Sequence, residues 1–478
     1  MEGFDFLWLF SFVAMTFHVG GVLSAFDAVM TARSPQGAVA WALALTTVPY
    51  VALPAYWVLG RRRFHGYLLA RRQGEEALDP LADGLGTALG GVEAELTIRL
   101  RRFKALEELA RLPFTRGNDV RLLIDGTRIH DAILDEIAAA RSFVLVQFYI
   151  IRDDAAGQGL ARALCERAAA GVRVFLLYDE IGSSDLTPSF TDGLRRSGVE
   201  VHPFHSRRGR QNRFQINFRN HRKVVVTDGR VALVGGANVG DEYRGLDPSI
   251  GAWRDTHVRI EGPAAICVQL SFVEDWYWAT KKILELDWSP RLSEHADRRV
   301  LVLPTGPADR LESCGLFFVH AINAAQRRIW IASPYFVPDS SVVHALQLAA
   351  LRGVDVRILI PERPDHLLVW LAAFSFLRET VEAGVKVAKY LPGFLHQKVL
   401  LVDDDVAAIG TANLDNRSFR LNFELTAVVA DGSFAREVEA MLVADFEQSR
   451  LEGPGTLEEK PWWFRLAARV ARLFAPIL

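Results

Sequence analysis

Two histidines in this chain of 478 residues are each followed by a lysine and an aspartate at the same spacing. The pattern H-x-K-x-x-x-x-D comprises His221, Lys223 and Asp228, and it recurs 175 residues later as His396, Lys398 and Asp403. A glycine and an asparagine follow each histidine at +14 and +17, namely Gly235 and Asn238 after the first and Gly410 and Asn413 after the second. Five coincident positions indicate an internal duplication rather than chance.

The residue types in each copy suit chemistry on a phosphate. A histidine can attack phosphorus or transfer a proton, while a lysine and an amide hold the negatively charged oxygens. In an extended chain the histidine and the lysine, two residues apart, project from one face. We therefore expect both histidines and both lysines to be catalytic, and Asn238 and Asn413 to bind the substrate.

The two aspartates of the motif are open to two interpretations. The segments HRKVVVTDG and HQKVLLVDD place an apolar run after each histidine, which predicts a buried strand closed by a turn at the aspartate. Asp228 and Asp403 belong to the repeated motif and are grouped here with the catalytic residues. Their position at a turn is also typical of a structural residue that caps a loop.

Two further carboxylates, Asp255 in WRDTHVRI and Glu424 in NFELTAVV, occupy comparable positions downstream of the histidines. Asp255 lies 34 residues after His221, and Glu424 lies 28 residues after His396. A carboxylate that accepts a hydrogen bond from a histidine ring fixes the tautomer and leaves the other nitrogen free to react. We expect both to orient a histidine; the alternative is that each merely begins a strand at the surface.

The duplication extends beyond the motif. The segments SFVLVQFYIIRDD, LARALCERAAA and GVRVFLLYDEIGS predict a strand, a helix and a strand, and RRIWIASPYFVPD, VVHALQLAALR and GVDVRILIPERPD predict the same order again. Strand, helix and strand with apolar strands is typical of an α/β layer structure. The predicted fold class is therefore α/β, with two similar units, each a central β-sheet flanked by helices, over residues 116–290 and 291–450.

The amino-acid composition indicates that the chain contains membrane segments. Half of the residues are hydrophobic, and the mean hydropathy is slightly positive. A formal net charge of −2 lacks the basic excess expected of a dedicated nucleic-acid-binding protein. The three cysteines, Cys165, Cys267 and Cys314, are scattered along the chain, so neither a disulfide framework nor a zinc site is indicated and a reducing compartment fits.

The chain opens with two apolar runs, at residues 6–26 and 38–59, each long enough to cross a bilayer as a helix. Residues 1–60 are therefore predicted to form a transmembrane hairpin with a short loop at Arg33. A cleaved signal peptide and a buried pair of soluble helices are the alternatives, but Glu2 and Asp5 stand where a signal peptide has basic residues.

Five arginines follow the second run: Arg61, Arg62, Arg63, Arg71 and Arg72. The positive-inside rule then predicts that the rest of the chain lies in the cytoplasm. Residues 61–115 add a linker, DPLADGLGTALGG, and a stretch, VEAELTIRLRRFKALEELARL, whose periodicity predicts a surface helix. Whether that helix joins the membrane and catalytic parts or has no role is left open.

The last segment, residues 451–478, contains PWWFRLAARVARLFAPIL. One helical face carries Arg465, Arg469 and Arg472, and another carries Trp463, Leu466, Val470, Leu473 and Ile477. Such a basic amphipathic helix suits a membrane interface, and docking on the protein's own surface is the alternative.

These segments resemble the phospholipase D superfamily, and within it the bacterial cardiolipin synthases. The paired histidine motif specifies only the superfamily, which also contains nucleases and hydrolytic phospholipases. The N-terminal hairpin and the WRDTH and NRSFRLNFE contexts narrow the resemblance to the synthases. It covers essentially the whole chain without a departure at a catalytic position, and residues 73–115 are the part least like the family.

The resemblance implies a transesterification in a bacterial cell membrane. One histidine attacks phosphatidylglycerol, glycerol leaves, and a second phosphatidylglycerol displaces the histidine to give cardiolipin. By analogy with the superfamily, His221 is the nucleophile and His396 the general acid and base, with Lys223, Lys398, Asn238 and Asn413 on the phosphate oxygens. No cofactor and no metal is expected. The expected partners are phosphatidylglycerol and cardiolipin rather than nucleic acid, and a homodimer is one possible assembly.

Three other functions stay open: a phospholipase D that transfers the phosphatidyl group to water, a membrane-bound nuclease, and a catalytically silent membrane scaffold. Two intact sets of site residues oppose the scaffold, and the net charge opposes the nuclease. The sequence does not show whether water or a second lipid alcohol is the acceptor, and phosphatidylethanolamine could replace one phosphatidylglycerol.

Overall fold

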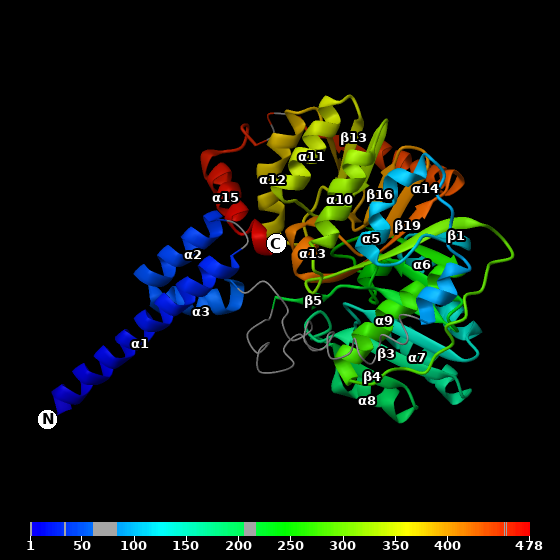
Figure 1. The fold of residues 1–478 in the computed structure, drawn as a ribbon, viewed down its shortest axis with the longest axis horizontal. Helices are drawn as coiled ribbons and strands as arrows, with labels where there is room; N and C mark the ends of the chain where they lie inside the picture. Colours follow the sequence, from blue (N-terminus) through cyan, green and yellow to red (C-terminus); the bar gives the residue numbers. More distant parts are fainter. Residues whose placement is uncertain (1, 33–34, 61–83, 205–216, 454, 456) are drawn as a thin grey trace. The chain divides into compact units, whose positions relative to one another are not determined.

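The computed structural model describes residues 2–32, 35–60, 84–204, 217–453, 455 and 457–478. The chain forms two compact units. The N-terminal unit comprises residues 1–68 and 206–218, and the α/β unit comprises residues 69–205 and 219–478. Figure 1 draws the N-terminal helices in blue and the α/β unit in the colours from cyan to red.

The N-terminal unit contains α1 (Glu2–Thr31), α2 (Pro35–Thr47), α3 (Pro49–Ala55) and a π-helical turn, η1 (Tyr56–Gly60). Among the described residues, only the span Trp8–Thr31 of α1 is long and apolar enough to cross a membrane. The second apolar run does not form one uninterrupted helix. Pro49 has no N–H to continue the hydrogen-bond ladder of α2, so a new helix begins there.

The helices of this unit contact one another through a hydrogen bond and through close packing at a glycine. The Tyr56 hydroxyl donates a hydrogen bond of 2.7 Å to Oδ2 of Asp27, which joins η1 to the end of α1. A Cβ added at Gly21 would lie 2.2 Å from the carbonyl oxygen of Leu45, so only glycine lets α1 and α2 come this close. Arg61, Arg62, Arg63, Arg71 and Arg72 fall outside the described residues, so the predicted membrane side stays a prediction.

The α/β unit is built on one continuous sheet. The first half contributes β1 (Thr115–Ile124), β2 (Phe143–Phe148), β3 (Arg173–Asp179), β4 (Glu200–Phe204), β6 (Val224–Thr227), β7 (Val231–Gly235) and β9 (Thr256–Glu261). The second half contributes β10 (Arg298–Thr305), β11 (Arg328–Ala332), β13 (Asp355–Pro361), β14 (Lys386–Tyr390), β16 (Val399–Val402), β17 (Val406–Gly410), β19 (Asn422–Ala430) and β20 (Ser449–Leu451).

The two halves of the sheet have equivalent strand orders when each is read from its own edge toward the middle. From one edge inward it is β4-β3-β2-β6-β7-β9-β1, and from the other edge it is β20-β14-β13-β11-β16-β17-β19-β10. The halves meet where β1 pairs antiparallel with β10, with Thr115 opposite Val300. Within each half the βαβ strands pair in parallel, as β2 does with β3 and β11 with β13. Both predicted repeats are therefore present, joined edge to edge.

Helices accompany both halves of the sheet (Figure 1). They are α6 (Gly126–Ala139), α7 (Ala155–Ala169), α8 (Pro188–Arg196) and α9 (Ala264–Thr280) in the first half, and α10 (Ser313–Ala324), α11 (Ser340–Leu351), α12 (Leu367–Val381), α13 (Asn416–Arg420), α14 (Gly432–Glu447) and α15 (Trp462–Leu473) in the second. Equivalent aspartates begin the crossover helices, since Asp154 accepts from the N–H of Gly157 and Asp339 from that of Val342, each at 3.0 Å. Such side-chain caps satisfy N–H groups that a helix leaves unpaired.

The helix predicted over VEAELTIRLRRFKALEELARL is wrong as a single element. A short 3-10 helix, η2 (Leu100–Phe103), and α5 (Ala105–Ala110) replace it, and Glu93 forms a bridge with Thr115 instead. The buried side chains of Phe103 and Leu106 fix the segment to the α/β unit. Arg102 adds a hydrogen bond of 2.8 Å to Oδ2 of Asp403, so the segment is tied to the turn of the second motif.

Asp228 and Asp403 lie where their strands turn, with φ of 54° and 50°. The Asp228 carboxylate accepts hydrogen bonds of 2.7 to 2.9 Å from the N–H groups of Arg141, Ser142 and Phe143. The Asp403 carboxylate accepts bonds of 2.8 to 3.1 Å from those of Gln326, Arg327 and Arg328. Each aspartate thus holds the start of β2 or β11, at the end of its own strand away from the histidine. These contacts fit the structural interpretation of both aspartates, and their place among the catalytic residues stays a prediction.

Replacing Asp403 with alanine tests this role. The change removes the acceptor that Arg102 and three N–H groups at the start of β11 share, and we expect the free energy of unfolding to fall by about 1–3 kcal/mol. Asp192→Ala is the control, because Asp192 makes only an exposed pair with Arg195 and its loss should cost below about 0.5 kcal/mol. Denaturant unfolding of the solubilised protein measures both; equal small losses would show that Asp403 does not hold the fold.

Candidate active site

Each histidine stands at the end of a short strand that pairs with the other half of the α/β unit. β5 (Arg219–Asn220) pairs in parallel with β19, and the N–H of His221 donates to the carbonyl of Phe423 at 3.0 Å. β15 (Phe394–Leu395) pairs in parallel with β8 (Trp253–Arg254), and the N–H of His396 donates to the carbonyl of Arg254 at 2.8 Å. The histidine of each half therefore lies against the backbone of the other half.

The ring of His221 is held by Glu424. Its Nδ1 lies 3.0 Å from Oε1 and 2.9 Å from Oε2 of that carboxylate. Three neighbours fix the carboxylate in turn: the hydroxyls of Thr411 and Ser418 donate to it at 2.5 and 2.8 Å, and the side-chain amide of Asn422 at 3.1 Å. Glu424 is fully buried, so its position is set by these bonds.

The ring of His396 is held in the same way by Asp255. Nδ1 lies 2.8 Å from Oδ2, and the N–H of Thr256 donates to Oδ1 at 2.8 Å. A Cβ added at Gly236 would lie 2.1 Å from Oδ1 of Asp255, so the glycine makes room for the carboxylate. The repeated glycines Gly235 and Gly410 are equally confined, since a Cβ added at Gly235 would lie 2.4 Å from the His257 ring and one added at Gly410 would lie 2.4 Å from the carbonyl oxygen of Leu425.

Both carboxylates therefore contact a histidine, but each contacts the histidine of the other half. Asp255 follows His221 in the chain yet meets His396, and Glu424 follows His396 yet meets His221. Sequence separation alone does not reveal this exchange. Thr411 and Ser418 were missed altogether, although both lie in GTANLDNRSFRLNFE, close before Glu424.

The lysines are buried beside their histidines. Lys223 Nζ donates to the carbonyl of His221 at 2.7 Å, and Lys398 Nζ to that of His396 at 2.5 Å. Lys398 Nζ also lies 2.8 Å from Nδ1 of His396. The charges of Lys223 and Lys398 act on both histidines, so the four side chains share one electrostatic site.

Burial sets the protonation of the site. It lowers the pKa of His221 to about 4, opposed by Glu424 and reinforced by Lys223. Burial and then the charge of Lys398 lower the pKa of His396 to about 4, and Asp255 opposes this shift. Burial also lowers the pKa of Lys398 to about 8. Both rings are therefore neutral at pH 7. A neutral ring that donates from Nδ1 to a carboxylate keeps a lone pair on Nε2 for attack or proton transfer.

The two asparagines differ in their contacts. Asn238 Oδ1 accepts from the N–H of Ile150 at 3.1 Å. The backbone N–H of Asn413 donates to Ser418 at 3.0 Å, while its buried side-chain Oδ1 has no hydrogen-bond partner among the described residues. The unpaired atom is an acceptor, so a ligand group that donates, such as a glycerol hydroxyl, would satisfy it; the predicted binding of phosphate oxygens would use the amide N–H groups of Asn413 and stays a prediction.

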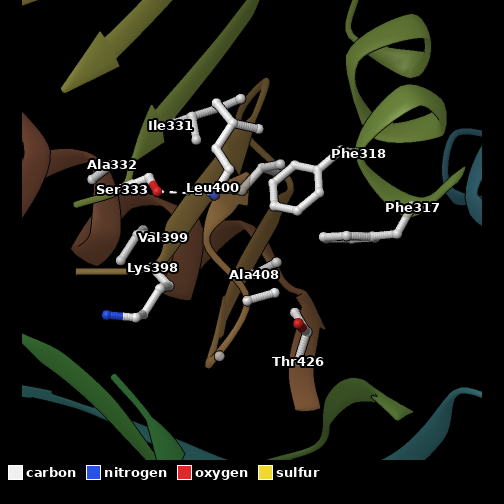
Figure 2. Close-up of a pocket in the computed structure, with 13 residues that line it drawn as sticks. Phe317, Phe318, Ile331, Ala332, Ser333, Lys398, Val399, Leu400, Ala408 and Thr426 are labelled. Atoms are coloured by element: carbon white, nitrogen blue, oxygen red, sulfur yellow. Dashed lines mark hydrogen bonds between the residues drawn. The ribbon is translucent and has the colours of Figure 1, made fainter. Parts of the chain in front are cut away.

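Aromatic rings line the site. Tyr149 meets the His221 ring at a centroid distance of 5.0 Å, and Trp253 and Phe394 meet the His396 ring at 5.1 and 5.9 Å. Figure 2 shows a pocket next to Lys398, between the rings of Phe317 and Phe318 and the strands β11, β16 and β17. At about 20 Å³ it has room for about one water molecule, so it is no lipid-binding cavity.

Comparison with known proteins matches the sequence of this chain to one family. A family model described as cardiolipin synthase, PLD-like domain, matches residues 133–247 and 318–446, and one described as phospholipase D-nuclease N-terminal matches residues 21–61. Cardiolipin synthase A of Pseudomonas putida (strain W619) is 50% identical over 98% of this chain and 99% of its own. That of Pseudomonas aeruginosa (strain LESB58) is 51% identical over 96% and 94%.

The chain belongs to the cardiolipin synthase family. This confirms the resemblance drawn from the motifs and identifies the chain as an enzyme of the phosphatidyltransferase type. Membership in the cardiolipin synthases and the apolar helix α1 together indicate association with a membrane. A solved structure, phosphatidylserine synthase of Haemophilus influenzae Rd KW20, shares the fold with a TM-score of 0.59 at 18% identity, covering 79% of this chain and 100% of that one.

The depressed histidine pKa values predict how stability depends on pH. A histidine in the unfolded chain has a pKa of about 6.5, while His221 and His396 have pKa values of about 4 in the fold. The neutral rings therefore stabilise the fold above about pH 6.5, and this contribution is lost as pH falls toward 4, by up to about 1.4 kcal/mol per pH unit for each ring.

Thermal unfolding between pH 7 and 4 measures this effect. We expect the double variant His221→Asn/His396→Asn to lose stability less steeply with falling pH than the native protein. His295→Asn serves as the control, because His295 is exposed. Parallel pH profiles for the native protein and the double variant would contradict the prediction.

Proposed function

We propose that this protein is a cardiolipin synthase that transfers a phosphatidyl group from one phosphatidylglycerol to another, releasing glycerol. The observation that carries the proposal is the pair of neutral histidines, each with Nδ1 on a buried carboxylate, in one site. Two such groups can act as nucleophile and as acid and base in turn. Full-length similarity to cardiolipin synthases supports the choice of lipid substrates.

In the first displacement Nε2 of His221 attacks phosphorus of the donor lipid. A bond forms between nitrogen and phosphorus, the bond to the glycerol oxygen breaks, and His396 gives that oxygen its proton. His396 is neutral at pH 7 in the folded protein, so it must take up this proton before the glycerol leaves. The negatively charged phosphodiester favours the uptake, because an anion close to a histidine raises its pKa.

In the second displacement His396 acts as the base. It takes the proton from a free glycerol hydroxyl of the second phosphatidylglycerol, whose oxygen attacks phosphorus while the bond to His221 breaks. One phosphodiester replaces another, so the exchange needs no nucleotide. Lys223, Lys398 and the amides of Asn238 and Asn413 hold the phosphate oxygens and stabilise the charge that develops on them.

The finer localisation belongs to the same proposal. We infer a multi-pass protein of the bacterial cell membrane with the α/β unit on the cytoplasmic side. The two apolar runs at the N-terminus and the arginines that follow them in the sequence support this arrangement. Phosphatidylethanolamine stays open as an alternative lipid in place of one phosphatidylglycerol.

Product analysis tests the reaction. The purified protein in vesicles that contain phosphatidylglycerol with a labelled headgroup glycerol should release one glycerol for each cardiolipin formed. Thin-layer chromatography and mass spectrometry resolve the lipids. Phosphatidic acid as the main product would mean that water is the acceptor, and the proposal would fail.

Trapping of the covalent intermediate tests the roles of the histidines. A donor with a p-nitrophenyl leaving group needs no proton from an acid, so His396→Ala should still release nitrophenol and retain a phosphatidyl group on His221. His221→Ala should retain none. Peptide mass spectrometry locates the adduct. The reverse pattern, with an adduct in His221→Ala only, would exchange the two roles.

A further inference from the structure

The C-terminal helix α15 is fixed to the α/β unit by one of its faces. Phe464, Ala468 and Ala471 are buried, and α15 lies beside α12 (Figure 1). The ring of Phe464 meets that of Phe374 edge-on at a centroid distance of 5.1 Å. The hydroxyl of Ser375 donates to the carbonyl of Ala468 at 3.1 Å. The predicted docking of this helix on the protein's own surface is therefore confirmed. The docked residues belong neither to the arginine face nor to the apolar face predicted from the sequence.

A second face of α15 is cationic. Arg472 borders the docked face and pairs with Glu379 of α12. Arg465 and Arg469, further round the helix, make no ion pair with a carboxylate in the part of the chain that the structure describes. Within the described ranges, these two exposed charges have no carboxylate of the protein as a partner.

A third face of α15 is apolar and exposed. The exposed fractions are 69% for Trp462, 58% for Trp463, 54% for Leu466, 46% for Val470, 76% for Leu473 and 44% for Phe474. At 100° per residue these side chains cover a sector of about 120°. A contiguous apolar face of this kind on a folded unit marks an interaction surface.

The start of α12 adds two exposed leucines at one end of this helix pair. Contacts of Phe464 with Phe374, Ala468 with Ser375 and Arg472 with Glu379 show that α12 and α15 run in the same direction. Leu367 and Leu368 therefore lie at the same end of the helix pair as the two tryptophans. They are 64% and 41% exposed.

We propose that the exposed face of α15 lies in the surface of a bilayer that contains anionic phospholipid. Its chemistry is that of an interfacial helix: an apolar sector, tryptophans at one end, and arginines along the border that can reach lipid phosphates. A second copy of the chain would have to accommodate Arg465 and Arg469 at the edge of a dry interface, whereas lipid phosphates supply the opposite charge. The α/β unit thus has its own membrane contact, in addition to the apolar helix α1.

Site-directed fluorescence on the full-length protein in vesicles of phosphatidylethanolamine and phosphatidylglycerol tests this contact. An environment-sensitive label on Leu466→Cys, in a Cys165→Ser background, should be quenched by nitroxide on the upper acyl chains and protected from aqueous iodide. The remaining cysteines, Cys267 and Cys314, are buried. Leu351→Cys is the matched control, since Leu351 is a 75% exposed leucine at the end of α11. Its label should respond to iodide and not to the lipid quencher.

The outcomes separate the bilayer from other occupants. Equal access of iodide to both labels would overturn the proposal. Shielding of the Leu466→Cys label from both quenchers, with disulfide cross-links between two chains, would instead make the face a contact between copies. Neither result depends on activity, so neither bears on the proposed reaction.

Charged substitutions give a second, independent readout. Leu466→Glu with Leu473→Glu should abolish lipid quenching of a label on Val470→Cys and lower cardiolipin formation in vesicles several-fold, while Leu351→Glu changes neither. Both target leucines are exposed, so thermal unfolding should be unaffected and reports whether the variant is folded. Unchanged lipid quenching in the charged variant would contradict the proposal.

Discussion

The hydrogen bond between each histidine ring and a carboxylate of the other half is the interaction on which the site depends. Glu424 and Asp255 are fully buried, and burial alone would raise the pKa of each carboxyl. The facing histidines and the lysines reverse that effect, so the pKa of both carboxyls lies below its usual value. The carboxylates stay ionised and hold the Nδ1 proton of a neutral ring. Neither half has this arrangement by itself.

The sheet explains how the exchange arises. The halves are joined at the centre through β1 and β10, and β9 and β19 flank that junction. Glu424 lies on β19, and Asp255 directly precedes β9. The short strands β5 and β15 reach the opposite half and place His221 against Glu424 and His396 against Asp255. A duplicated unit with one histidine and one carboxylate thus gives one site with two oriented histidines, as two successive displacements require.

The sequence predicted the parts of the site that are local to the motif. The repeated spacing identified His221, Lys223, His396 and Lys398. The apolar runs that follow them predicted the strands β6 and β16. The histidines and lysines themselves lie just before β6 and β16 rather than within a strand, because their backbone turns from one half toward the other. The pairing of Glu424 with His221 joins residues 203 apart, so no local pattern encodes it.

Residues with other roles were harder to infer. Asp228 and Asp403 share the motif spacing with the histidines, yet they hold the backbone at the start of β2 and β11, which only the contact pattern reveals. The segment over residues 92–112 has a helical pattern but breaks where Arg102 turns toward Asp403. For α15 the sequence pattern predicted a basic face and an apolar face. The helix packs on α12 through neither of them, but through Phe464 and small alanines, whose burial depends on the neighbouring helix.

The exchange of carboxylates between the halves is tested most directly by the nitrogen NMR signals of the two site histidines in ¹⁵N-histidine-labelled protein. His221→Asn and His396→Asn assign the two signals. At pH 7 we expect both rings to be neutral and protonated on Nδ1. Glu424→Gln should then shift the Nδ1 signal of His221 and leave that of His396 nearly unchanged, and Asp255→Asn should do the opposite. A Glu424→Gln protein in which only the His396 signal moves would contradict the crossed arrangement.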